Sequence, residues 1–255
     1  MEMTQPIRNS FNYRRLRLAA VICAIATAFL ACVPLHGIDD LLLAPFFDGR
    51  TFPLHGSAAV EFLHSYAGKI PPVLAGLWFI RIAVRPGAAA PFNGVSARPA
   101  ALCALGAMLA SIALVSLLKK LTGMYCPWDL AIYGGSAEHS TPLYEMLHGN
   151  FSGHCWPSGY SGGIFSAYAW CLYLLLRGKG APAVKCAFAL VTLLGLLGGV
   201  LQMARGAHFP THVIASMTLD YAVCFALMSP LLRRAAANRA TQENQDGNDH
   251  EQPIR

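Results

Sequence analysis

Long runs of apolar residues alternate with short polar segments along most of this chain. Six windows of roughly 18–23 residues, the length that crosses about 30 Å of hydrocarbon, predict membrane-spanning helices. They lie at about 16–35, 66–84, 99–118, 159–176, 184–203 and 210–231. The second contains Lys69 and a Pro-Pro pair, and the fourth begins with a Gly/Ser-rich segment, so five spans is the alternative count. The pattern predicts an all-α, polytopic membrane helical bundle of about six transmembrane helices.

Composition supports a membrane protein and excludes an ordinary soluble domain. The chain is 55% hydrophobic and 13% charged, with a mean hydropathy of +0.44. Lysine and arginine near span ends stay cytoplasmic, and an inside N-terminus places most of the 19 basic residues on that side. Both termini are therefore predicted to be cytoplasmic. A cleavable signal peptide is the alternative for 1–35, but its apolar part is longer than usual.

The chain divides into three parts by composition. Residues 1–15 are predicted to be a cytoplasmic N-terminal segment, and 16–232 a six-span membrane domain with its chemical motifs in 119–212. Residues 233–255 are polar and lack aromatic side chains, which predicts a disordered cytoplasmic tail. The net charge of +6 sits at span ends and not in one basic stripe, so it implies neither a nucleic-acid nor a protein partner.

The eight cysteines fall into two groups. Six lie in apolar runs and are expected to pack as small hydrophobic side chains. Cys126 and Cys155 share one outer loop, and an oxidising compartment would allow a disulfide between them. A zinc site with the nearby His148 and His154 is the alternative, but the spacing fits no standard ligand set. We therefore expect no metal and no cofactor.

Three polar clusters stand at span ends on the predicted outer side. They are KKLTGMYCPWDL at 119–130, PSGY at 157–160 and QMARGAHFPTH at 202–212. Alone, the lysines are typical of an interfacial anchor and the second cluster of a helix cap. Together, cations and helix-terminal amides can bind phosphate oxygens while an imidazole attacks phosphorus. The combination predicts phosphoryl transfer on the outer face.

The order and spacing of these clusters resemble the type-2 phosphatidic acid phosphatase superfamily, to which vanadium haloperoxidases are related. That family carries K-x6-R-P, P-S-G-H and S-R-x5-H-x3-D on a six-span helical bundle. The resemblance covers roughly 60–230, and 119–212 carry its specific part. CPWDL and RGAHFPTH also resemble a proteobacterial variant subgroup that reads C-P-W-D-L, P-[AS]-G-H and R-G-A-H-F-x-S-H.

The motifs match this chain only in part. The matching positions are Lys119, Pro127, Pro157, Ser158, Gly159 and His208, and the differing positions are Cys126, Tyr160, Leu201, Gln202 and His212. The resemblance implies that His208 attacks phosphorus and forms a phosphohistidine, with His212 hydrogen-bonding its other ring nitrogen. Phosphate oxygens would be held by Lys119, Arg205 and the backbone of Ser158 and Gly159. Arg205 would replace the charge lost at Cys126 and Gln202.

Tyr160 stands where the family has the histidine that protonates the leaving group. A phenol with a pKa of about 10 is a poor proton donor at neutral pH, and losing a general acid costs on the order of 10² to 10⁴ in rate. We consider three consequences: a bias toward diphosphates, whose leaving group is a weak base; rescue by His154; or a degenerate member that binds lipid phosphate without turnover.

Several other polar residues leave two interpretations open. Asp129 either pairs with Lys119 or Arg205 or caps a helix. His36, His55 and His64 either line a headgroup groove or are solvated loop residues. The sequence therefore predicts a multi-pass protein of the bacterial inner membrane that removes phosphate from a lipid mono- or diphosphate at the periplasmic face, with membrane lipids as its partners.

Overall fold

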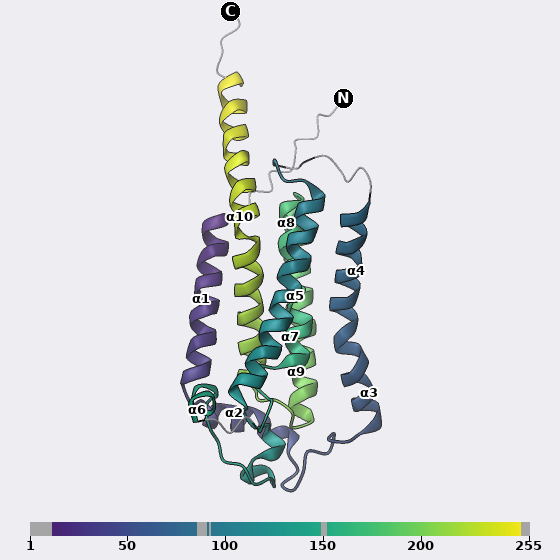
Figure 1. Cartoon of the computed structure of the whole chain (residues 1–255), viewed down its shortest axis with the longest axis vertical. Coiled ribbons are helices and arrows are strands. Elements are labelled where there is room, and N and C mark those ends of the chain that lie inside the picture. Colours follow the sequence, from purple (N-terminus) through teal and green to yellow (C-terminus); the bar gives the residue numbers. More distant parts are fainter. Residues whose placement is uncertain (1–11, 86–90, 92, 149–151, 251–255) are drawn as a thin grey trace, which may run out of the picture.

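The computed structural model describes residues 12–85, 91, 93–148 and 152–250. Long helices form a bundle, and short helices in the loops close one end of it (Figure 1). The bundle helices are α1 (Tyr13–Cys32), α4 (Ile70–Val84), α5 (Ala97–Thr122), α7 (Gly159–Phe165), α8 (Tyr168–Leu176), α9 (Ala181–Ala204) and α10 (Pro210–His250). The short elements are α2 (His36–Leu43), η1 (Ala44–Phe46), α3 (Ala58–Tyr66), η2 (Ala67–Lys69), η3 (Pro127–Asp129), η4 (Ala131–Tyr133) and α6 (Pro142–His148).

Five stretches of the described residues are helical, long and apolar enough to cross a membrane. They are Tyr13–Cys32, Ala58–Val84, Ala97–Asp129, Ala181–Ala204 and Pro210–Gln242. Many large apolar side chains on these helices are exposed on the bundle surface, as the hydrocarbon-facing side of a membrane helix requires. The all-α membrane bundle predicted from the sequence is confirmed at this level.

The window predicted as a span at 159–176 is not a single helix, because α7 and α8 divide it. Between them the backbone tightens into i→i+3 hydrogen bonds, with the Ala167 N–H on the Ile164 carbonyl (3.1 Å) and the Trp170 N–H on the Ala167 carbonyl (2.9 Å). The Ser166 hydroxyl also donates to the Gly163 carbonyl (2.7 Å). In Figure 1, α8 continues along the bundle from the end of α7.

The tail predicted to be disordered is helical through His250, as the continuation of α10. The tail is rich in alanine, arginine and glutamine, which favour helix, and extending an existing helix avoids the cost of nucleation. Residues 251–255 of the tail and 1–11 of the predicted N-terminal segment lie outside the described residues. The start of α1 and the end of α10 lie at the same end of the bundle (Figure 1).

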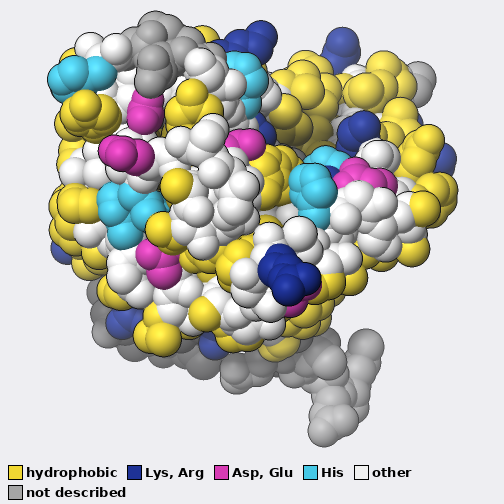
Figure 2. Space-filling model, turned by 90° about the horizontal axis from the view of Figure 1, so that it is seen from below, with side chains coloured by type: hydrophobic (Ala, Val, Ile, Leu, Met, Phe, Trp, Pro, Cys, Tyr) yellow, Lys and Arg dark blue, Asp and Glu magenta, His cyan; other side chains and the backbone are white. Residues whose placement is uncertain are grey.

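Helix α10 is the central element, since it packs against α1, α5, α7, α8 and α9. Asp220 on the buried side of α10 is hydrogen-bonded to α5, because the Ser111 hydroxyl donates to its carboxylate. The opposite end from the chain termini carries the long loops. Figure 2 shows this end, where histidine and acidic side chains lie among apolar ones. The fold thus gathers the three polar clusters of the sequence at one end of the bundle.

Candidate active site

The second and third clusters are joined by backbone hydrogen bonds at the loop-bearing end. The Ser158 N–H, just before α7, donates to the His212 carbonyl in the first turns of α10 (3.1 Å). The Ser216 hydroxyl lies 2.8 Å from the Ser158 carbonyl oxygen and 3.1 Å from that of His212. These bonds fix the start of α7 against the start of α10. They also occupy the Ser158 N–H, which the sequence predicted to bind phosphate.

A left-handed turn at Gly206 brings His208 into the site between α9 and α10. Gly206 has a φ of +69°, and a Cβ there would also collide with the Phe52 ring. The turn lets the chain reverse within a few residues after α9. As a result His208 and His212 are both buried, with 5% and 1% of their surface exposed.

The two histidine rings lie edge to face, with centroids 5.7 Å apart and an interplanar angle of 70°. Among the described residues, Nδ1 of His208 and both ring nitrogens of His212 are buried without a hydrogen-bond partner. The predicted hydrogen bond between the rings is therefore not formed in this structure. Burial, followed by the positive charge of Lys119 and the neighbouring His212, lowers the pKa of His208 well below its usual range. His208 is thus a neutral imidazole with a free lone pair at neutral pH.

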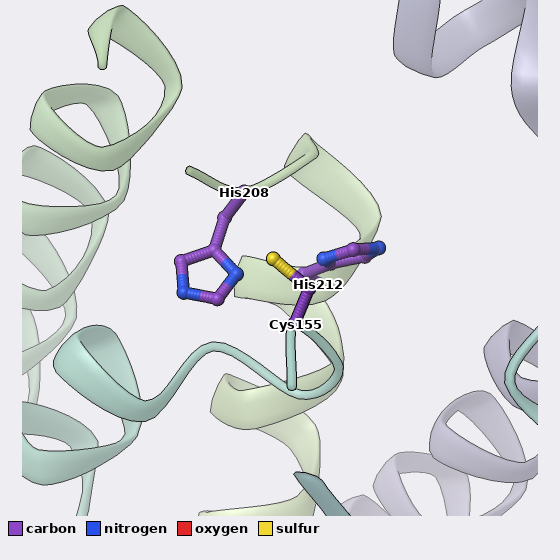
Figure 3. A group of neighbouring side chains, drawn as sticks. All are labelled: Cys155, His208 and His212. Carbon is purple, nitrogen blue, oxygen red and sulfur yellow. The ribbon is translucent and has the colours of Figure 1, made fainter. Parts of the chain in front are cut away.

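Cys155 lies between the two histidines (Figure 3). It is joined to Cys126 by a disulfide. The Cα atoms of the pair are 5.1 Å apart, within the range of ordinary disulfides. The Cys155 sulfur and one nitrogen from each histidine lie within 4.8 Å of one another. A disulfide sulfur is not the thiolate that binds zinc, so this group offers two imidazoles, fewer than the ligands of a catalytic zinc site. That the reaction needs no metal stays a prediction.

Lys119 extends from the last turn of α5 over the start of α7. A Cβ at Gly159 would lie 3.2 Å from the Lys119 ammonium nitrogen, so the absence of a side chain there admits the cation. The Ser158 hydroxyl beside them is fully buried and lacks a partner within the described ranges. An ammonium, a free hydroxyl and the first residue of α7 therefore meet near His208, as the phosphate oxygens of a substrate would require.

Arg205, the residue that ends α9, is buried and held by three neighbours. Its guanidinium donates to the Gln202 side-chain oxygen (2.9 Å) and binds the Glu61 carboxylate of α3 (2.5 Å). It also lies 6.0 Å from the centre of the Trp128 ring. Sequence reasoning missed Glu61. The sequence did contain a hint, because an arginine buried at a membrane boundary is unfavourable without an acidic partner.

Tyr160, in the first turn of α7, contacts α3. Its hydroxyl donates to the Leu63 carbonyl (3.4 Å), and its ring stacks on His64 with centroids 5.4 Å apart and an interplanar angle of 20°. A Cβ at Gly68 or at Gly198 would collide with the ring, so two glycines make the slot that holds it. Tyr160 is therefore packed in place on both faces.

The remaining predicted residues lie at the edge of the site. His154 is next to the disulfide, and its Nδ1 lies 3.3 Å from the Lys119 carbonyl oxygen. Asp129 accepts from the Cys126 N–H (3.1 Å) and so caps the short helix η3, one of its two predicted roles. His36 stacks on His139, with ring centroids 4.3 Å apart, and His55 meets Trp128 edge to face, with centroids 4.6 Å apart. Both histidines are therefore packed in the loops.

A cavity of about 740 Å³ opens beside Lys119 and Tyr160 and runs between α4 and α5. Its polar end is formed by His64, Lys69, Lys119 and Tyr160, and its long walls are apolar. Gly76, Ile80, Leu105 and Met108 are among the wall residues. The cavity therefore joins a cationic end near His208 to an apolar channel on the membrane-facing side of the bundle.

A family model described as the PAP2 superfamily matches residues 100–235, which is 136 of the 255 residues. The chain belongs to the PAP2 superfamily. No curated protein and no solved structure gives a match. The PAP2 match includes the three polar clusters, which confirms the predicted resemblance at the level of the superfamily, and it supports a phosphatase-type hydrolase. Glu61 and His64 lie before the matched residues.

Proposed function

We propose that this PAP2 superfamily member is a membrane lipid phosphatase that acts through a phosphohistidine on His208. The observation that carries the proposal is the position of His208, a buried neutral imidazole that lies near enough to Lys119 to be affected by its charge, while Lys119 itself lines the end of an apolar cavity. An imidazole with a free lone pair is a nucleophile for phosphorus, and a nearby cation stabilises the charge that spreads over the phosphoryl oxygens.

Each site residue has a role in this reaction. His208 attacks phosphorus in line with the leaving oxygen, and the phosphoryl oxygens lie against Lys119 and the buried Ser158 hydroxyl. Arg205 adds a second cation once substrate reaches the guanidinium. His212 hydrogen-bonds the second ring nitrogen of His208, a contact that tightens when substrate binds, as hydrogen bonds in apo sites commonly do. Water then hydrolyses the phosphohistidine.

The apolar cavity supports a lipid as the substrate. Its volume of about 740 Å³ lies within the range of small-molecule sites, and its apolar walls suit a hydrocarbon chain. Burial of a chain contributes about 0.8 kcal/mol for each methylene removed from water. A phosphate attached to such a chain reaches Lys119 while the chain stays between α4 and α5. The substrate is thus a lipid mono- or diphosphate.

The membrane topology is part of the proposal. In this proposal α7 and α8 together make the sixth crossing; six crossings put both termini on one side, and the basic residues at span ends favour the cytoplasmic side for them. The Cys126–Cys155 disulfide suits an oxidising compartment, which supports a site that faces the periplasm of a bacterial inner membrane. The motifs CPWDL and RGAHFPTH support membership of the variant subgroup that they resemble.

A second candidate function is a silent binder of lipid phosphates. The observation that favours it is the contact of the Tyr160 hydroxyl with the Leu63 carbonyl, which directs the phenol away from a leaving group. A silent binder would retain the cations and the cavity. It would not form a phosphohistidine.

The two functions are separated by measuring both turnover and the covalent intermediate. The purified protein in detergent is tested with phosphatidate, phosphatidylglycerophosphate, lipid A and undecaprenyl diphosphate, with and without chelator. We expect chelator-resistant phosphate release that His208→Ala abolishes and that His148→Ala, on exposed α6, leaves unchanged. An acid-labile phosphoprotein should appear with labelled substrate and be absent from His208→Ala. Lipid binding without either signal would establish the silent binder.

A further inference from the structure

Helix α3 brings two ionisable side chains to the site from outside the residues that match the PAP2 family model. Glu61 binds Arg205, and His64 follows it one helical turn later on the same face. The Arg205 contact therefore fixes α3 against the end of α9. It also fixes the distance of His64 from the phosphate-binding cations.

His64 lines the cationic end of the cavity together with Lys119 and Tyr160. The cations Arg205, Lys119 and Lys69 oppose protonation of its ring and the Glu61 carboxylate favours it, so the negative charge of a bound phosphate would help His64 to hold a proton. Its ring also interacts electrostatically with His208. Its Nδ1 is buried and has no hydrogen-bond partner in the part of the chain that the structure describes. An imidazole with unused hydrogen-bonding capacity thus lies within range of both the nucleophile and the phosphate cations.

We propose that His64 is the catalytic acid that protonates the leaving oxygen, and that Tyr160 is the positioning residue that holds it there. This inference rests on the function proposed above and deepens it. Tyr160 takes the sequence position of the family's proton donor, and the structure shows that residue stacked on a histidine of another helix. The imidazole is therefore supplied by α3, and the α7 position supports it.

The contacts of Tyr160 fit a positioning role. Its hydroxyl is bound to the backbone of Leu63, the residue before His64, and its ring lies flat against the imidazole. The slot between Gly68 and Gly198 prevents the ring from turning away. Both contacts bear on the segment of α3 that carries His64, and the stack is the one that touches the imidazole, so loss of the ring would move it.

The His208 lone pair forms the bond to phosphorus as the bond from phosphorus to the leaving oxygen breaks, and protonated His64 gives its proton to that oxygen. The lipid alcohol or lipid phosphate departs, leaving phosphohistidine and neutral His64. Water then attacks phosphorus, His64 takes the proton from that water, and the bond from phosphorus to His208 breaks. Inorganic phosphate leaves, and both histidines return to their starting states.

His154 is less well placed for this role. Its ring lies against the backbone carbonyl of Lys119 and does not line the cavity. The Lys119 ammonium group, which would bind the phosphate, meets Gly159 instead, and both residues line the cavity. Replacing the two histidines separately therefore distinguishes the two donors.

The test compares leaving groups. Each variant is assayed on a lipid phosphomonoester, which has an alcohol leaving group, and on an aryl ester, which has a nitrophenolate leaving group. The variants are His64→Gln, His154→Gln, Tyr160→Phe, Tyr160→Leu and His148→Gln. Nitrophenolate departs without a proton. We expect His64→Gln to lose about 10² in kcat/KM on the alcohol ester and less than fivefold on the aryl ester, because kcat/KM reports phosphoryl transfer to His208 and not the later hydrolysis that both esters share. Tyr160→Phe, which keeps the stack, should retain most activity, and Tyr160→Leu should show the His64→Gln pattern in milder form.

The outcomes separate this proposal from the function on which it rests. Absence of turnover and of phosphohistidine in the wild type overturns the proposed function itself. If the wild type is active and His64→Gln loses the same activity on both esters, or loses none, only the role of His64 is overturned. If His154→Gln loses activity on the alcohol ester and not on the aryl ester, while His64→Gln behaves as the wild type, then His154 is the proton donor. His148→Gln, exposed on α6, should match the wild type.

Discussion

The Arg205 guanidinium at the end of α9 binds the Glu61 carboxylate of α3 at 2.5 Å, although 144 residues separate them in sequence. A buried arginine needs a counter-charge, and here the partner comes from the segment that forms one wall of the cavity. Arg205 is therefore neutralised in the absence of substrate. A phosphate that reaches it competes with Glu61.

Removal of the Glu61 charge is expected to strengthen phosphate binding. Glu61→Gln keeps an oxygen acceptor for Arg205 and removes the competing charge, so the inhibition constant for inorganic phosphate should fall about three- to tenfold. Glu61→Ala also removes the contact that holds α3, so kcat should fall in that variant. Product-inhibition kinetics on both variants check this. An unchanged inhibition constant in Glu61→Gln would show that phosphate does not reach Arg205.

The slot around Tyr160 is expected to be intolerant of a single methyl group. In Gly198→Ala the new Cβ would lie 2.8 Å from the Tyr160 ring, so the ring and the stacked His64 must shift. A displacement near 1 Å at a catalytic group can cost on the order of 10² in rate, and we expect kcat to fall at least tenfold. Gly106→Ala on α5 is the matched control, because nothing among the described residues lies within 4 Å of its Cβ. Equal activity of the two variants would contradict a fixed ring.

Filling the cavity is expected to discriminate substrates by chain length. Ile80→Trp introduces a larger side chain into the wall between α4 and α5, so KM for a long-chain lipid phosphate should rise about fivefold or more. A short-chain analogue that does not reach Ile80 should be unaffected. Leu193→Trp, on an exposed face of α9 away from the cavity, controls for the bulk of tryptophan. If Ile80→Trp affects both chain lengths equally, the chain does not lie in this cavity.

The Cys126–Cys155 disulfide is expected to stabilise the site. It closes a loop of 29 residues, which corresponds to about 3.5 kcal/mol in the chain-entropy description. The double variant Cys126→Ser/Cys155→Ser should therefore unfold several degrees lower in detergent. It should also lose activity, because Cys155 lies against His208 and His212. Cys32→Ser, at an exposed free cysteine, is the control. An unchanged melting temperature in the double variant would contradict this.

Asp39 is expected to make the protein more stable in mild acid. Burial raises its pKa to about 6, and the Thr211 hydroxyl and N–H that bind it offset part of the cost of burial. Between about pH 4 and pH 6 the folded state binds more protons at Asp39 than the unfolded state, so this contribution to stability falls as the pH rises. Asp39→Asn should remove that slope from melting curves between pH 5 and pH 7.5.

The pKa of Asp48 is shifted in the opposite direction to that of Asp39, so Asp48 serves as the control. The backbone N–H groups of Thr51 and Arg50 lower its pKa, so its contribution is lost as the pH falls through that lowered value. Asp48→Asn should leave the slope between pH 5 and pH 7.5 as in the wild type. If Asp39→Asn shows the same curve as Asp48→Asn, Asp39 does not titrate in this range.

The lengths of the apolar runs and the order of the motifs were enough to predict a helical membrane bundle with the three polar clusters at one end. The break between α7 and α8 was harder to predict, because apolar content alone does not show where the backbone tightens into i→i+3 bonds. The helical tail was missed because polar composition is typical of both disorder and an exposed helix. Local sequence did not show that a preceding helix continues through it.

Sequence motifs identify candidate site residues where the motif is local, and they do not identify residues that are brought in by distant contacts. Lys119, Ser158, Gly159 and His208 are recognisable by their neighbours in sequence. The roles of Glu61 and His64 depend on where α3 docks, and no spacing rule connects them to Arg205 or Tyr160. The short segment containing them reads as an ordinary amphipathic turn until the bundle is assembled.

Helix α10 has 41 residues, and at 1.5 Å for each residue it is about 60 Å long, twice the thickness of the hydrocarbon layer. If it crosses the hydrocarbon layer once, about 30 Å of its length lies outside that layer. His212 lies near one end of this helix, and the other end extends past the start of α1 (Figure 1). A fluorescent label near that far end would report the orientation of the protein without touching the candidate site residues.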